Sequence, residues 1–127
     1  MSHYRPHMML KVRSKKIMAS AKGKPCTIRI ASMVPGHSCA PDETVNLCHL
    51  DKAGGKGTST KVSDMAGVYG CQHCDDITSG VDGKRLQFIQ EKYPTVLGQR
   101  IYSALVETHA LMIEEGVIVI PDGEIVS

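Results

Sequence analysis

The sequence is poor in aromatic side chains and contains no long apolar run. Only 4% of its 127 residues are aromatic, with no tryptophan and a single phenylalanine, Phe88. The core must therefore be built mainly from valine, isoleucine, leucine and methionine, and broad aromatic platforms for stacking single-stranded bases are not expected. No apolar run approaches the roughly 20 residues of a membrane span, so we expect no membrane partner.

Acidic residues are missing from the first 41 positions. Residues 1–41 carry eight lysines or arginines and no acid, whereas residues 42–127 carry seven basic and thirteen acidic residues, so +8 and −6 give the net charge of +2. A basic segment on an acidic body favours a polyanion as the partner of that segment. The alternative is a solvated leader without a partner.

The length is typical of one domain. We expect a basic N-terminal arm over residues 1–24 and a body over residues 25–127. The N-terminal segment lacks the apolar stretch and the small-residue cleavage site of a secretory signal, so we expect a cytoplasmic protein.

The five cysteines are odd in number, and in a reducing cytoplasm they favour metal binding over a disulfide framework. Residues 71–74 form a C-x-x-C pair. This spacing lets two thiolates of one tight turn reach a single tetrahedral zinc ion. The five are Cys26, Cys39, Cys48, Cys71 and Cys74.

Two further ligands must complete such a zinc site. Cys26 and Cys39 flank a loop that can fold back, so we predict a closed structural site made by these two and the C-x-x-C pair. A rival set adds Cys48 and His49 to the pair, but consecutive residues of a strand point to opposite faces. The remaining alternative is that the cysteines are small buried apolar residues.

Alternating and periodic segments predict a mixed α+β fold. Thr27–Ile30 and Thr44–Leu50 alternate between polar and apolar residues, which predicts two strands, and an antiparallel hairpin is their simplest pairing. Residues 117–120 are expected to be a short strand or an extended tail. Helical spacing and stop signals predict helices over residues 12–22, from residue 75, over 84–92 and over 95–116.

Residues 51–61 are rich in glycine, lysine, serine and threonine. They lack the register of a phosphate-binding P-loop, and we expect a flexible connection that contacts a nucleic-acid backbone. The residues predicted to bind DNA are Lys22, Lys24, Arg29, Lys52 and Lys56.

The order of the expected elements is typical of a ββα-metal, or HNH-type, nuclease centre. In such a centre a strand-end histidine acts as general base on water, and a divalent metal stabilises the leaving oxygen. We therefore predict that His49 is the base and that Asp75 and Asp76 hold the catalytic metal. The alternatives are a zinc ligand or a core residue for His49, and a helix N-terminal charge pair for the two carboxylates.

The same residues resemble a known family. The motifs are Gly23-Lys-Pro-Cys26-Thr-Ile-Arg29-Ile, then Cys39, then Pro41-Asp-Glu-Thr-Val-Asn-Leu-Cys-His49-Leu, then Cys71-x-x-Cys74. In order and spacing they resemble the small YbcO-like nucleases encoded by prophages, which look related to the catalytic domain of Ref, a phage RecA-dependent HNH endonuclease. The resemblance covers about residues 12–80.

This resemblance implies a zinc-containing ββα-metal (HNH-like) fold with an added C-terminal helix. It implies metal-dependent DNA cleavage in a bacterial host cell during recombination, with a RecA filament as a further partner. The implied cofactors are a structural zinc ion and catalytic magnesium or manganese. By position, Cys26, Cys39, Cys71 and Cys74 resemble the zinc ligands, His49 the strand-end histidine and Arg29 a basic position on the first strand.

One position departs from the family. Its C-x-x-C is typically followed by histidine, whereas this chain has Asp75. A carboxylate is a good ligand for magnesium or manganese, but the change also fits a member with altered activity. The alternatives to a nuclease are therefore a non-catalytic zinc module that binds DNA or a recombination protein, and an adaptor that contacts proteins through the helix of residues 96–112.

Overall fold

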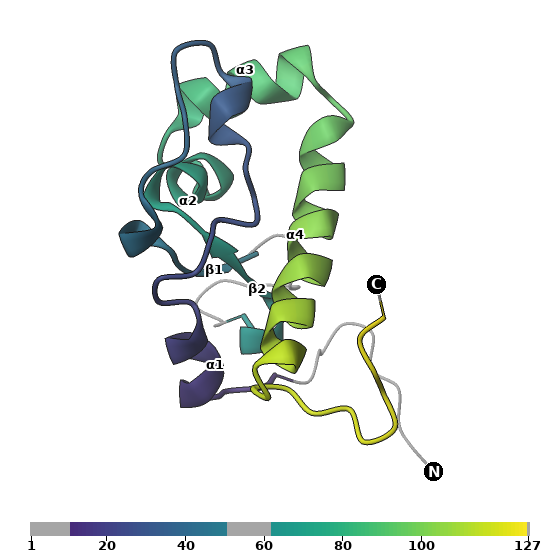
Figure 1. Cartoon of the computed structure of the whole chain (residues 1–127). Coiled ribbons are helices and arrows are strands. Elements are labelled where there is room, and N and C mark those ends of the chain that lie inside the picture. The colour runs from purple at the N-terminus through teal and green to yellow at the C-terminus, as the bar shows by residue number, and fades with distance from the viewer. Residues whose placement is uncertain (1–10, 51–61, 127) are drawn as a thin grey trace.

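The computed structural model describes residues 11–50 and 62–126 of the chain. In these residues two strands and four α-helices form a small α+β fold (Figure 1). The elements are α1 (Lys15–Ser20), β1 (Asn46–His49), β2 (Gly67–Gly70), α2 (Gln72–Ser79), α3 (Gly83–Lys92) and α4 (Val96–Glu114), with 3₁₀ turns at Ala31–Met33, Asp42–Thr44 and Asp64–Ala66.

β1 and β2 form an antiparallel hairpin. His49 lies opposite Gly67 at one end, and Asn46 lies opposite Gly70 at the other. All four residues of β2 are buried. The strand predicted over residues 44–50 is thus confirmed in its central part, and the helix α2 follows the hairpin directly.

The predicted partner of this strand was wrong. Residues 27–30 form no strand, although the Thr27 amide donates a 2.7 Å hydrogen bond to the carbonyl of Tyr69. Arg29 has a φ of 51°, and this left-handed conformation interrupts an extended run. β1 pairs instead with residues 67–70, for which the sequence indicated only an apolar approach to the C-x-x-C pair.

The predicted helices are confirmed with changed ends. α1 is shorter than residues 12–22 because the Ser14 hydroxyl caps it, accepting a 3.1 Å hydrogen bond from the Ile17 amide. α2 begins at Gln72, three residues earlier than expected. α4 ends at Glu114, and Gly116 after it has a φ of 74°. Residues 117–120 are not a strand.

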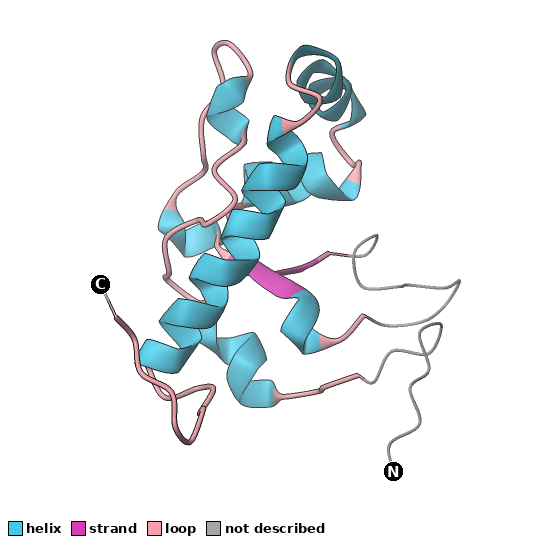
Figure 2. Cartoon of the chain, turned by 90° about the vertical axis from the view of Figure 1, so that its right-hand side faces the viewer, coloured by secondary structure: helices cyan, strands magenta, loops and turns pink. Residues whose placement is uncertain are grey.

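The core lies between the hairpin and the helices on either side of it. α4 runs across the hairpin and packs on β2 (Figure 2). The Thr108 hydroxyl of α4 accepts a 3.1 Å hydrogen bond from the Tyr69 amide and lies 3.1 Å from the Thr27 hydroxyl. Buried polar groups are almost always hydrogen-bonded, because a buried polar group without a partner destabilises the fold. These hydrogen bonds therefore fix α4 on the sheet. In the part of the chain that is described, no helix combines the length and the apolar character needed to cross a bilayer.

α1 contacts the hairpin at β1. Ile17 and Ala21 are buried, and the Tyr69 hydroxyl donates a 2.8 Å hydrogen bond to the hydroxyl of Ser20. The described part of the basic N-terminal segment therefore contacts the body. The division of the chain at residue 24 stays a prediction.

Gly70 is expected to tolerate no side chain. A Cβ atom at this position would lie 2.6 Å from Cδ1 of Ile28 and 2.8 Å from Sγ of Cys48. Because overpacking a core strains it, Gly70→Ala should lower the free energy of unfolding by about 1–3 kcal/mol. Chemical denaturation measures this loss.

Gly83 provides the matched control. A Cβ atom there would meet nothing within 4 Å, and alanine restricts the unfolded chain more than glycine does. Gly83→Ala should therefore leave the stability unchanged or raise it by up to about 1 kcal/mol. Equal losses for the two variants would contradict the packing described for the hairpin.

Candidate functional site

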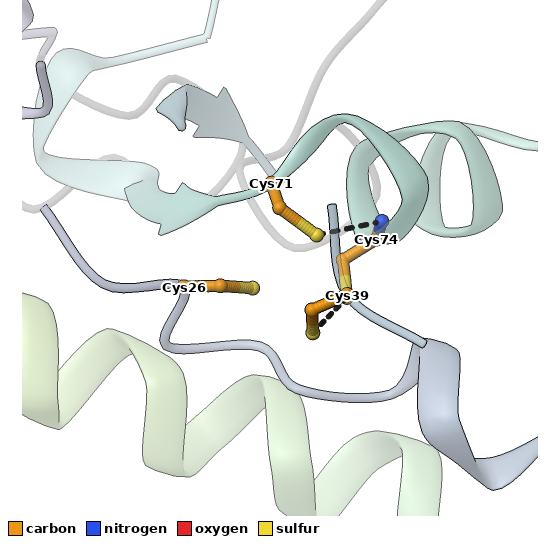
Figure 3. A group of neighbouring side chains, drawn as sticks. All are labelled: Cys26, Cys39, Cys71 and Cys74. Carbon is orange, nitrogen blue, oxygen red and sulfur yellow. Dashed lines mark hydrogen bonds between the residues drawn. The ribbon is translucent and has the colours of Figure 1, made fainter. Parts of the chain in front are cut away.

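Four cysteine side chains converge on one point beside α2 (Figure 3). Their Sγ atoms all lie within 4.8 Å of one another. Cys71 immediately precedes α2 and Cys74 lies in its first turn, whereas Cys26 and Cys39 come from the two ends of the loop before β1. Cys39 is half-buried and the other three are buried.

The spacing of these sulfur atoms fits a tetrahedral metal. A zinc ion bound by four thiolates at its usual Zn–S length separates neighbouring sulfur atoms by about 3.8 Å. The Sγ atoms of Cys39 and Cys74 are 3.7 Å apart. The cluster can therefore hold a metal such as zinc if the remaining sulfur atoms move slightly closer together.

The buried thiols of the cluster shift one another's protonation. The hydrogen bond from Cys74 lowers the pKa of Cys26, and the same hydrogen bond, together with burial, raises the pKa of Cys74. Burial and the charge on Cys26 raise the pKa of Cys39 to about 12. Without a cation Cys39 and Cys74 thus stay protonated. A bound metal deprotonates the thiols that coordinate it.

Cys48 lies outside this cluster. Its buried thiol faces the carbonyl of Gly70, 3.6 Å away. Burial, followed by the neighbouring carboxylate of Asp75, raises the pKa of this thiol. Among the described residues the rival ligand set, which pairs Cys48 and His49 with the C-x-x-C cysteines, is not assembled.

His49 stands at the end of β1 and hydrogen-bonds with a carboxylate. Its Nε2 atom lies 2.9 Å from Oδ1 of Asp64, and the Ser14 amide donates a 2.7 Å hydrogen bond to Oδ2 of the same group. Asp64 is only 5% exposed, whereas the His49 side chain is 26% exposed. The ring is therefore held by a buried partner but is still reachable from solvent.

This environment keeps Asp64 ionised. Burial acts to raise its pKa, but the hydrogen bonds from His49 and from the Ser14 amide outweigh burial and hold the pKa below its ordinary value. An ionised acceptor at Nε2 favours the tautomer with the proton on Nε2, which leaves Nδ1 as a proton acceptor. Within the described residues Nδ1 makes no hydrogen bond.

The sequence reasoning missed Asp64. The signal was present, since in an antiparallel hairpin the residues before the second strand lie beside the end of the first. Because residues 64–70 were not predicted to contain a strand, Asp64 was not placed next to His49. The 3₁₀ turn Asp64–Ala66 brings its carboxylate there.

The two predicted metal ligands lie in the middle of α2. Asp75 is half-buried beside Cys48, and Oδ1 of Asp76 accepts a 2.8 Å hydrogen bond from Nε2 of Gln72. Neighbouring strand residues point to opposite faces, so Cys48 and His49 diverge. The structure brings His49 together with Asp64, and Asp75 together with Cys48. The catalytic roles of His49, Asp75 and Asp76 stay predictions.

Two of the residues predicted to bind DNA are paired with acidic residues of the C-terminal part of the chain. Lys24 forms a 3.0 Å salt bridge with Glu115, and Arg29 forms one of 2.8 Å with Glu107. Lys22 is exposed. Lys52 and Lys56 lie outside the described residues.

The comparison with protein families gives a match over most of the chain. Residues 15–109 match the family described as "Putative nuclease YbcO". The chain belongs to this family. The match extends from α1 into α4 and includes the cysteine cluster and the His49–Asp64 pair. The resemblance to YbcO-like nucleases is thereby confirmed, and membership supports a nuclease-type function that acts on phosphodiester bonds of nucleic acid. No curated protein and no solved structure gives a significant match.

Proposed function

We propose that this YbcO-family protein is a DNA endonuclease of the HNH type that depends on a divalent metal. The observation that carries the proposal is the partly exposed ring of His49, held by the buried carboxylate of Asp64. The order of β1, β2 and α2, with His49 at the end of β1, supports the assignment to the ββα-metal class.

In this proposal His49 takes a proton from water. Nδ1 accepts the proton while Asp64 stabilises the positively charged ring through Nε2. The hydroxide so formed attacks phosphorus, the bond from phosphorus to the leaving oxygen breaks, and the leaving oxygen takes a proton from solvent. Magnesium or manganese, when bound, stabilises the negative charge of the scissile phosphate and of the leaving oxygen.

Asp75 is the proposed holder of this metal, with Asp76 as the second proposed ligand. Carboxylate oxygens suit magnesium and manganese, and Asp75 directly follows a ligand of the cysteine cluster, which fixes its backbone. Asp76 already accepts a hydrogen bond from Gln72. We therefore expect Asp75 to contribute more to metal binding than Asp76.

Plasmid nicking at increasing magnesium concentration tests these roles. Asp75→Ala should lower the rate or the apparent magnesium affinity by about 100-fold, the scale of losses at metal sites. Asp76→Ala, one residue away and of the same charge change, should have a smaller effect. Unchanged magnesium dependence in Asp75→Ala, with zinc retained, would rule out Asp75 as the ligand.

One observation favours the alternative of a non-catalytic zinc module that binds DNA. Asp75 lies against Cys48 and makes no hydrogen bond with His49. DNA binding without cleavage in either magnesium or manganese would select this alternative.

The proposal extends to recombination, with DNA in a RecA filament as substrate. This last part rests only on the resemblance to Ref.

A further inference from the structure

A basic surface lies immediately beside His49. Arg13, Lys15 and Lys16 are all exposed, and they are named here the α1 basic surface. Ser14 lies between Arg13 and the two lysines in the sequence. Its amide donates a hydrogen bond to one carboxylate oxygen of Asp64, and His49 contacts the other oxygen. The three basic residues therefore flank the Ser14 amide, which is connected to the His49 ring through the carboxylate of Asp64.

This segment is held in place at several points. The Val12 amide donates a 3.0 Å hydrogen bond to the Ser63 hydroxyl, and the Asp64 amide donates one of 2.9 Å to the Val12 carbonyl. Nη1 of Arg13 donates to the carbonyl of Val62 over 2.7 Å. The position of the α1 basic surface relative to His49 is thus fixed by contacts across 50 or so residues of sequence.

The two lysines of this surface form no salt bridge within the described part of the chain. Among residues 11–50 and 62–126, no carboxylate forms a salt bridge with Lys15 or Lys16. In contrast, Lys24 and Arg29 are paired with Glu115 and Glu107. A lysine without an acidic partner can neutralise a phosphate without first losing another ion pair.

We infer that the α1 basic surface binds backbone phosphates of the DNA strand whose scissile phosphate reaches His49. The inference rests on the proposed function, because it takes His49 as the point of cleavage. Lysine and arginine contacts with phosphate position the duplex and carry no sequence information. The surface thus sets the place of the strand.

Two double variants with equal charge change test this surface. Lys15→Ala with Lys16→Ala removes two charges beside His49, whereas Lys84→Ala with Lys92→Ala removes two exposed charges from α3, at the opposite end of the molecule (Figure 1). Binding is measured by fluorescence anisotropy with a labelled DNA duplex, from 50 to 200 mM salt, without magnesium or manganese.

Each phosphate contact contributes about 0.9 to the slope of log affinity against log salt. For the Lys15/Lys16 variant the magnitude of this slope should therefore fall by about 2. The variant should also bind DNA on the order of tenfold more weakly at the lowest salt concentration. The Lys84/Lys92 variant should keep the slope and lose less than about twofold in affinity. Equal slopes and affinities for the two variants would overturn the inference.

The failure of the inference can be told from failure of the proposed function. If wild type cleaves plasmid and His49→Gln does not, but the two double variants bind alike, only the inference is wrong. If the Lys15/Lys16 variant loses binding as expected and wild type cleaves no DNA in either metal, the surface stands and the endonuclease proposal fails.

Discussion

Replacing Cys74 with serine is expected to release the metal and unfold the domain. Its Sγ atom lies in a cluster of four sulfur atoms within 4.8 Å of one another, and the residue is fully buried. A structural zinc site contributes on the order of 10 kcal/mol or more to folding. Because a domain has only about 5–15 kcal/mol of stability in total, the loss of one ligand should leave little folded protein at room temperature.

Two readouts measure this effect. The zinc content per chain, measured by mass spectrometry, should fall from one to well below one, and the cooperative thermal transition in circular dichroism should disappear. Since any change at a buried position perturbs packing, Cys39→Ser repeats the test at the half-buried ligand. Cys39→Ser should also lose zinc.

Cys48→Ser is the matched control for both variants. Cys48 is buried, as Cys74 is, but lies outside the cluster, so the variant should keep one zinc per chain and a cooperative transition. Full zinc content in Cys39→Ser, or zinc loss in Cys48→Ser, would contradict the four-cysteine site.

Replacing His49 with glutamine is expected to abolish most of the DNA cleavage while the fold is kept. Glutamine retains a hydrogen-bond donor for the buried carboxylate of Asp64, 2.9 Å from the imidazole in the structure, but it cannot accept a proton from water. General base catalysis contributes about 10²–10⁴-fold, so the single-turnover rate should fall by that factor.

The fold of this variant is checked by its zinc content and its thermal transition, which should match wild type. Added imidazole supplies a second test with His49→Ala, because a free base in the vacated space restores part of the lost rate only if a base is what is missing. A His49→Gln variant that cleaves at the wild-type rate would show that His49 is not the general base.

Helices and metal ligands could be predicted from the sequence because their signals are local. α3 and α4 follow from the spacing of apolar residues, and the end of α4 from Gly116. The four cysteines follow from the chemistry of zinc, which requires thiolates in a limited spacing. The structure brings together the same four residues that the sequence predicted.

The partner strand of the hairpin could not be predicted in this way. β2 has the sequence Gly-Val-Tyr-Gly and is buried throughout, so it lacks the alternation of polar and apolar residues by which a half-exposed strand is recognised. Residues 27–30 show that alternation but do not form a strand, because Arg29 has a positive φ. No local sequence pattern predicts the positive φ of Arg29.

Contacts between distant segments were equally out of reach. The salt bridge of Arg29 with Glu107 joins residues 78 positions apart, and the Asp64 hydrogen bond with Ser14 joins residues 50 apart. The first contact neutralises a residue that the sequence offered as a DNA ligand. The second brings the basic N-terminal segment to His49. Both depend on the packing of segments far apart in the sequence, which local patterns do not predict.

Nicking of a supercoiled plasmid by the zinc-loaded full chain tests the central claim most directly. Wild type should convert the plasmid to the open circle in magnesium or manganese and leave it intact without either ion, and His49→Gln should leave it intact in all three conditions. Wild-type protein that carries one zinc and binds the plasmid, yet leaves it intact in both metals, would contradict the account.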